Sequence, residues 1–179
     1  IFFYHIIILI VIIFSPIIIF YRILKNKEDK KRYKEKFSIP SKKRVKGKLI
    51  WFHGASVGEI LSIVPLIKNY EKNKSVAQIL VTSSTLSSSK VLEKFKFKKT
   101  IHQFYPLDSL FLTNTFLNFW KPCVAIFVDS EIWPSMYNNI NNKKIPLILL
   151  NARLTKKTFK KWMNLKNFGR SVFDKITIA

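Results

Sequence analysis

Residues 49–59 read LIWFHGASVGE: an apolar run, a turn of small residues and a single carboxylate, Glu59. The apolar residues that follow, over 60–67, have the spacing of a helix. A strand that turns into a helix is the usual place for chemistry in an open α/β sheet, because ligands bind beyond the carboxyl ends of its strands. We therefore expect Glu59 in the first turn of a helix, whose dipole favours the ionised carboxylate.

Apolar runs alternate with amphipathic stretches through the rest of the chain. Strands are predicted at 49–53, 76–82, 101–105, 123–128 and 145–150. Helices are predicted at 60–72, 88–95 and 110–120, after Trp133-Pro134, and as a long basic helix over 155–173. This alternation indicates an α/β fold, a Rossmann-like parallel sheet with helices on both faces. The sequence has neither Gly-x-Gly-x-x-Gly nor a Walker-type loop, which argues against a dinucleotide site.

The N-terminal segment has the composition of a membrane anchor. Residues 1–21 are apolar except for His5, Ser15 and Pro16, and a helix of that length spans about 30 Å, the thickness of a bilayer core. A cleaved signal peptide would have a shorter apolar region and a small-residue cleavage site. Residues 22–48, expected as a juxtamembrane linker, are strongly basic, and positive charge stays on the cytoplasmic side. We expect a single-pass anchor in the inner membrane, with the domain at 49–179 in the cytoplasm.

The charge balance limits the classes of binding partner that we expect. The net charge is +22, from 32 basic and 10 acidic residues, and most of the basic residues are Lys. Arg is the residue suited to bidentate phosphate and base recognition, so we expect an anionic membrane surface or anionic substrate rather than a nucleic acid. The single cysteine, Cys123, permits no internal disulfide and is expected as a small buried thiol. The three histidines show no metal-ligand spacing, so no metal is expected.

Polar residues follow four of the predicted strands, where a parallel sheet gathers them at one edge. They lie at 53–59, in the Ser/Thr-rich turn 82–85, at 129–134 and at 151–154. Each group also has a simpler interpretation. Ser56 and Glu59 have the spacing of a helix capping box, and the carboxylates at 129 and 131 could cap the next helix, with Pro134 in its first turn. Taken together, the four groups favour a site over four separate caps.

Three of these blocks resemble the signature segments of the bacterial 3-deoxy-D-manno-octulosonic acid (Kdo) transferases, which move Kdo from CMP-Kdo to the lipid A precursor. The blocks read HGASVGE at 53–59, DSEIWP at 129–134 and NARL at 151–154. The basic segment KRYKEKF at 31–37 also fits the family. The resemblance implies the GT-B architecture, two Rossmann-like domains facing across a cleft. This chain resembles only the N-terminal, acceptor-binding half, so we expect it to be a fragment without the donor domain.

The resemblance also assigns site residues. The glutamate proposed as general base in the family falls on Glu59, with Glu131 as a second catalytic carboxylate. The family's second motif usually reads Glu-x-Glu, whereas here its first position is aspartate. The residues expected to contact substrate are His53, Ser56, Gly58, Thr82, Ser83, Asp129, Trp133, Asn151 and Arg153. Lysines 156, 157, 160 and 161 either bind the phosphates of the acceptor or form a solvated face.

The implied substrates are CMP-Kdo and the lipid A precursor, lipid IVA, in lipopolysaccharide biosynthesis, with no cofactor. Two alternatives remain from the sequence: a GT-B transferase for another anionic lipid or sugar nucleotide, and a non-catalytic membrane-tethered binding module. The sequence beyond Ala179 would separate the enzyme from the module, because the enzyme needs a second nucleotide-binding half.

Overall fold

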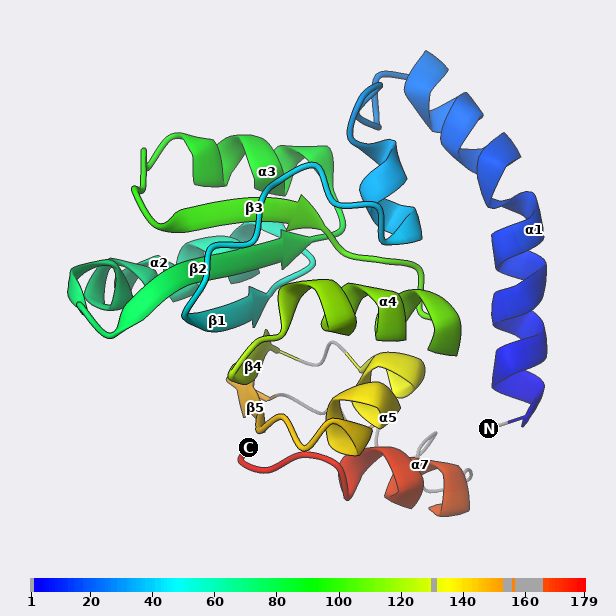
Figure 1. Ribbon diagram of the computed structural model, residues 1–179. Coiled ribbons are helices and arrows are strands. Elements are labelled where there is room, and N and C mark those ends of the chain that lie inside the picture. Colours follow the sequence, from blue (N-terminus) through cyan, green and yellow to red (C-terminus); the bar gives the residue numbers. More distant parts are fainter. Residues whose placement is uncertain (1, 130–131, 153–155, 157–165) are drawn as a thin grey trace.

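Five parallel strands form the centre of the protein (Figure 1). The computed structural model describes residues 2–129, 132–152, 156 and 166–179. The strands are β1 (Lys48–His53), β2 (Val76–Ser83), β3 (Thr100–Phe104), β4 (Val124–Val128) and β5 (Leu147–Leu150). Their order across the sheet is β3-β2-β1-β4-β5. Near the C-terminus, Ile178 forms a further parallel bridge to Ile148 at the β5 edge.

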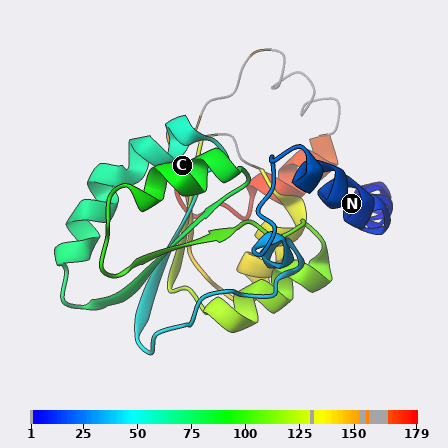
Figure 2. The ribbon, with the colours of Figure 1, turned by 90° about the horizontal axis from the view of Figure 1, so that it is seen from above.

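Helices cover both faces of this sheet (Figure 2). On one face lie α2 (Val57–Lys72) and α3 (Leu86–Glu93), and on the other α4 (Leu110–Trp120), α5 (Pro134–Asn142) and α7 (Lys166–Phe173). Because successive side chains of a strand point to opposite faces, Trp51 packs in the core with α4 and α5 while Phe52 packs in the core with α2. The expected Rossmann-like fold is confirmed, and each predicted strand lies within two residues of its observed bounds.

One local prediction needs correction, and a second is tested only in part. Cys123 is exposed rather than buried, because β4 begins one residue later and Cys123 lies in the turn after α4, where its thiol contacts the Leu49 carbonyl oxygen at 3.1 Å. The helix predicted over 155–173 is confirmed from Lys166 to Phe173, while residues 155 and 157–165 lie outside the described part of the chain.

The strand order places a switch point at the middle of the sheet. The chain leaves β1 through α2 on one face and leaves β4 through α5 on the other. β1 and β4 are neighbours, so the two connections separate at their carboxyl ends, which is the position where doubly wound sheets bind ligands. We refer to this position as the crevice. Glu59 lies in the turn after β1, and Asp129 directly follows β4, so both residues come after the carboxyl ends of these neighbouring strands.

The apolar N-terminal segment forms a helix, α1 (Phe2–Leu24), which lies on the side of the sheet to which the arrowheads of β2 and β3 point (Figure 1). Residues Tyr4–Leu24 have a mean hydropathy of 2.8, enough by length and composition to cross a membrane. One narrow stripe of α1 faces the domain. Most of the large apolar side chains of α1 are exposed: Ile6, Ile7, Leu9, Ile10, Val11, Ile13, Phe14, Ile17, Ile18, Phe20, Tyr21 and Leu24.

The segment expected to be a linker is folded onto the edge strand β3. It contains a 3₁₀ helix, η1 (Tyr33–Phe37), whose Glu35 is fully buried. The Glu35 carboxylate accepts hydrogen bonds from the Arg32 guanidinium at 2.9 and 3.1 Å and from the Phe104 amide at 2.7 Å. The Leu107 amide donates to the Lys36 carbonyl oxygen at 2.9 Å. The segment that contains η1 therefore provides hydrogen-bond partners for backbone groups at the β3 edge that would otherwise be unpaired.

We expect Glu35→Gln to lower the free energy of unfolding by about 3 kcal/mol, because it leaves the Arg32 guanidinium without its buried counter-charge. Urea denaturation in detergent measures the change. The matched control is Glu93→Gln: this carboxylate also faces Arg32, at 3.8 Å, but its side chain is 65% exposed, and the loss should stay under about 1 kcal/mol. Equal losses in the two variants would contradict this account of the edge.

Candidate functional site

The turn after β1 holds Glu59 in a helix cap. Ser56 is the N-cap of α2, and its hydroxyl accepts a hydrogen bond from the Glu59 amide at 3.3 Å. The Glu59 carboxylate reaches back, accepting from the Ala55 amide at 2.8 Å and from the Ser56 hydroxyl at 2.6 Å. The capping interpretation is thus confirmed by geometry. The same bonds fix a half-buried carboxylate at the crevice, so capping and a chemical role are compatible.

Gly54 permits this arrangement. A Cβ at this position would lie 3.0 Å from the Cβ of Glu59 and 3.4 Å from Cδ1 of Ile60. The absence of a side chain therefore allows the start of α2 to lie directly against the end of β1. Gly58 is under no such restriction, since its nearest neighbour would be the Ser56 hydroxyl at 4.0 Å.

A layer of buried polar side chains and aromatic rings packs next to the turn that contains Glu59. His53 is fully buried, with Nδ1 2.9 Å from the Thr82 hydroxyl, and that hydroxyl also accepts from Trp51 Nε1 at 2.9 Å. The His53 ring packs on Tyr105 with centroids 4.0 Å apart, and Tyr105 packs on Trp133 at 5.0 Å. His53 and Thr82 were expected to contact substrate. Both side chains are fully buried in this structure, and their contact with substrate stays a prediction.

The segments after β4 and β5 turn sharply beside each other. Asp129 has a φ of 60° and Asn151 a φ of 55°, left-handed values that aspartate and asparagine tolerate better than most residues. The Asp129 amide donates to the Leu150 carbonyl oxygen at 2.8 Å, which joins the two turns. Asp129 and Trp133 are half-buried and Asn151 is exposed, so these three side chains are accessible after the carboxyl ends of β4 and β5.

Asp108, which the sequence did not single out, links the site to α1. Its carboxylate accepts from the amides of Ser135 and Met136 at 2.9 and 2.8 Å, which caps α5, and from the Tyr4 hydroxyl of α1 at 2.5 Å. Burial raises the pKa of Asp108, while these hydrogen bonds act in the opposite direction. One buried carboxylate therefore positions both α1 and the helix that follows the acidic segment.

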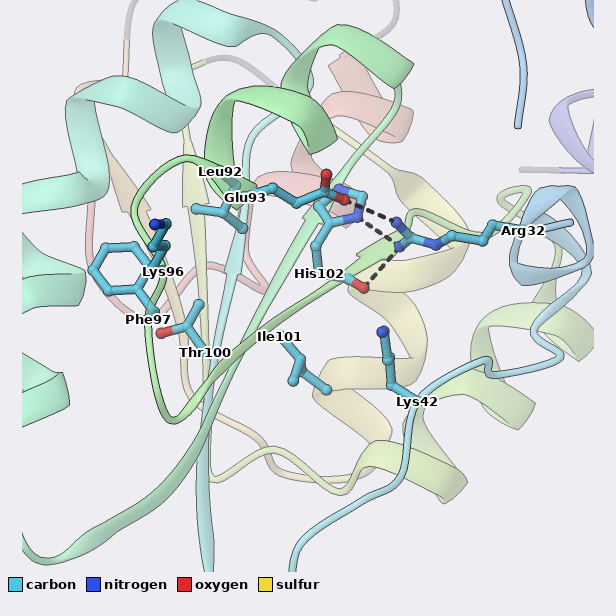
Figure 3. A pocket seen from close by; sticks show the side chains of 9 residues that line it. All are labelled: Arg32, Lys42, Leu92, Glu93, Lys96, Phe97, Thr100, Ile101 and His102. Carbon is cyan, nitrogen blue, oxygen red and sulfur yellow. Dashed lines mark hydrogen bonds and ion pairs between the residues drawn. The ribbon is translucent and has the colours of Figure 1, made fainter. Parts of the chain in front are cut away.

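A second group of side chains connects the basic segment to the Ser/Thr-rich turn through His102. Arg32 lies 2.8 Å from Nδ1 of His102, and Nε2 of His102 lies 2.8 Å from the Ser83 hydroxyl. Since arginine can only donate, Nδ1 is the acceptor and the proton sits on Nε2. Burial, with Arg32 and Lys42 nearby, lowers the pKa of His102 to about 3. Arg32 and His102 line a cavity of about 220 Å³ at the β3 edge, and Figure 3 shows both side chains there.

The structure brings most of the expected residues to one edge but gives them unequal exposure. Ser56 and Gly58 are exposed at the start of α2, whereas Ser83 is fully buried against His102. Lys156 is exposed. The remaining expected residues, Glu131, Arg153, Lys157, Lys160 and Lys161, lie outside the described residues. Among the residues that are described, no group of three or more His, Cys, Asp or Glu side chains is placed to hold a metal ion.

Comparisons with known proteins agree on one family. The family described as "3-Deoxy-D-manno-octulosonic-acid transferase (kdotransferase)" matches residues 31–179. The chain is 42% identical to a 3-deoxy-D-manno-octulosonic acid transferase of Rickettsia bellii over 85% of this chain and 36% of that protein. It is 37% identical to a probable mitochondrial 3-deoxy-D-manno-octulosonic acid transferase of Arabidopsis thaliana, over 90% of this chain and 37% of that protein. The chain thus spans about a third of the length of these relatives.

A solved structure supports the fold. The crystal structure of a UDP-N-acetylglucosamine 2-epimerase matches with a TM-score of 0.51 and 14% identity, over 75% of this chain and 39% of that chain. At this level of identity the likeness concerns the fold alone.

We expect the free energy of unfolding to fall as the pH drops from about 6.5 toward 3, because the unfolded chain protonates His102 in this range and the folded chain does not. His102→Gln removes this contribution. The wild type should therefore lose roughly 1 kcal/mol more per pH unit than the variant. Urea denaturation at several pH values measures both, and parallel pH profiles would contradict the buried neutral histidine.

Proposed function

The chain belongs to the Kdo transferase family of glycosyltransferases, and on that basis we propose that it is the acceptor-binding part of an enzyme that transfers Kdo from CMP-Kdo to lipid IVA in lipopolysaccharide biosynthesis. The observation that carries the proposal is the position of Glu59, a fixed carboxylate beside the crevice between β1 and β4. The identities of the donor, CMP-Kdo, and of the acceptor, lipid IVA, rest on the family resemblance.

The proposed reaction needs a base at this position. A hydroxyl of the acceptor sugar attacks the anomeric carbon of Kdo, the bond from that carbon to the phosphate oxygen breaks, and CMP leaves with the bonding electrons. The attacking hydroxyl loses its proton as the new bond forms. Glu59 accepts that proton in our proposal, since a positioned carboxylate within hydrogen-bond reach serves as a general base.

The contacts of Glu59 suit this role. The Ala55 amide holds Oε2 in place, while Oε1 is bonded to a serine hydroxyl, which rotates freely. When the Ser56 hydroxyl turns toward substrate, Oε1 becomes available for the proton of the acceptor. The cap thus orients the base without using both oxygens permanently.

Other residues of the edge bind the acceptor in this proposal. Ser56, Gly58, Asp129, Trp133 and Asn151 border the crevice and contact the sugar, while His53, Thr82 and Ser83 support it from beneath. Glu131 and Arg153 shape the acceptor site. The positive charge of the chain, +22, suits an acceptor that carries phosphates at an anionic membrane surface.

We propose that α1 anchors this domain at the cytoplasmic face of the inner membrane. The helix has the length and hydropathy of a membrane span, and the basic residues after it favour the cytoplasmic side. The single pass expected from the sequence stays a prediction. In the structure, the bond from the Tyr4 hydroxyl to Asp108 keeps the first turn of α1 beside the domain. While this bond is kept, α1 lies along the membrane face and does not cross the membrane.

We expect Glu59→Gln to reduce the turnover of the enzyme that contains this chain by about 100-fold or more, because the general base is removed. Glutamine is accepted at this position of a capping box, so the fold should be retained. Kdo transfer to lipid IVA measures turnover, and circular dichroism checks the fold. Glu93→Gln, a change at an exposed carboxylate on α3, should leave transfer unchanged. Near-normal transfer in Glu59→Gln would refute the role of Glu59.

The exposed Cys123 provides a test of the orientation in the membrane. In spheroplasts, a membrane-impermeant maleimide should leave Cys123 unmodified until the inner membrane is opened, because the domain faces the cytoplasm. Cys123→Ser gives the background. Rapid labelling in intact spheroplasts would contradict a cytoplasmic domain.

A further inference from the structure

α1 contacts the domain through a regular stripe. Tyr4, Ile8, Ile12, Ser15 and Ile19 recur every three or four residues and are buried or half-buried, whereas the other faces of the helix are exposed. The stripe is fixed at its start by the bond from the Tyr4 hydroxyl to Asp108 and near its end by Ile19, which is 6% exposed. The helix is therefore part of the domain surface on one side and chemically suited to lipid on the other.

A cavity of about 240 Å³ lies between this stripe and the carboxyl ends of the strands. Its walls include Ile8, Val11, Ser84, Tyr105, Leu107 and Trp133. They come from α1 and from the segments after β2, β3 and β4, so the cavity exists only while α1 is docked.

The charged groups in the wall are already paired. Asp108 bonds to Tyr4, Ser135 and Met136, and Lys36 pairs with the buried Glu28 at 2.5 Å. The remaining wall is mainly aliphatic and aromatic. An occupant therefore gains affinity by burying apolar surface, and burying a charge there would carry a desolvation cost.

The cavity and Glu59 share one edge of the sheet. Tyr105 and Trp133 in the cavity wall pack on each other, and Tyr105 packs on His53 with centroids 4.0 Å apart. His53 is followed by the turn whose Ala55 amide bonds Glu59. The cavity is therefore linked to the Glu59 turn through the packed rings of Tyr105 and His53.

We propose that the cavity holds part of one acyl chain of the acceptor lipid, so that α1 serves as one wall of the acceptor site as well as an anchor. This inference rests on the proposed function, since it requires an acylated sugar as acceptor. The occupant is the acceptor rather than bulk phospholipid, because the wall is built from the strand ends that border the catalytic crevice.

The test compares two neighbouring positions of α1 in the enzyme that contains this chain. Ile8→Trp places an indole in the cavity, whereas Ile7→Trp places it on the lipid side, where Ile7 is 58% exposed. Kdo transfer is measured with lipid IVA and with its deacylated form. Ile8→Trp should raise the KM for lipid IVA about tenfold and leave transfer to the deacylated form unchanged, and Ile7→Trp should change neither. Equal behaviour of the two variants would overturn the proposal that the cavity holds an acyl chain, and it would leave the proposed transferase function intact.

A second measurement needs no turnover. Trp133 lines the cavity, so lipid IVA with brominated acyl chains should quench its fluorescence. The signal of Trp133 is the difference in fluorescence between the unsubstituted chain and Trp133→Phe, both in detergent. Brominated phosphatidylglycerol at the same mole fraction should quench much less. Equal quenching by the phospholipid would overturn the choice of occupant, and absence of quenching by both would overturn the cavity. Quenching by lipid IVA without any Kdo transfer would refute the proposed function alone.

Discussion

The closure of the β3 edge by Glu35 and Arg32 is the interaction on which the rest of the arrangement depends. A parallel sheet of this order leaves β3 without an outer neighbour, and its backbone groups need partners. The Glu35 carboxylate accepts from the Phe104 amide, and the Arg32 guanidinium donates to the His102 carbonyl oxygen at 2.8 Å. These bonds fix η1, which follows α1 in the chain, and α1 lies beyond the carboxyl ends of the strands (Figure 1).

The candidate site combines two features with different physical origins. The crevice arises from topology, because the connections after β1 and β4 leave on opposite faces of the sheet. The position of the carboxylate arises from local chemistry: Gly54 permits close approach, and the Ser56 cap orients Glu59. The site therefore needs both the whole sheet and one short turn, and it is built from backbone amides, a serine hydroxyl and one carboxylate.

Sequence patterns predicted the strands and most helices well, since each depends on the spacing of apolar residues over a few turns. They did less well on the environment of single side chains. Cys123 was expected to be buried because it adjoins an apolar run, but the strand starts one residue later. His53, Thr82 and Ser83 lie at or near the ends of their strands as expected, and all three are fully buried: Tyr105 packs on His53, and His102 lies against Ser83.

The sequence by itself determined the parallel α/β fold, the apolar helix at the N-terminus and the capped turn at Glu59. Each of these features follows from the pattern of residue types over short stretches of the chain. Only the tertiary structure decided that residues 22–48 close the sheet edge, that Asp108 joins α1 to α5, and that α1 and three strand ends enclose a cavity. These features join residues far apart in the chain, such as Tyr4 and Asp108, and local spacing carries no information about such pairs.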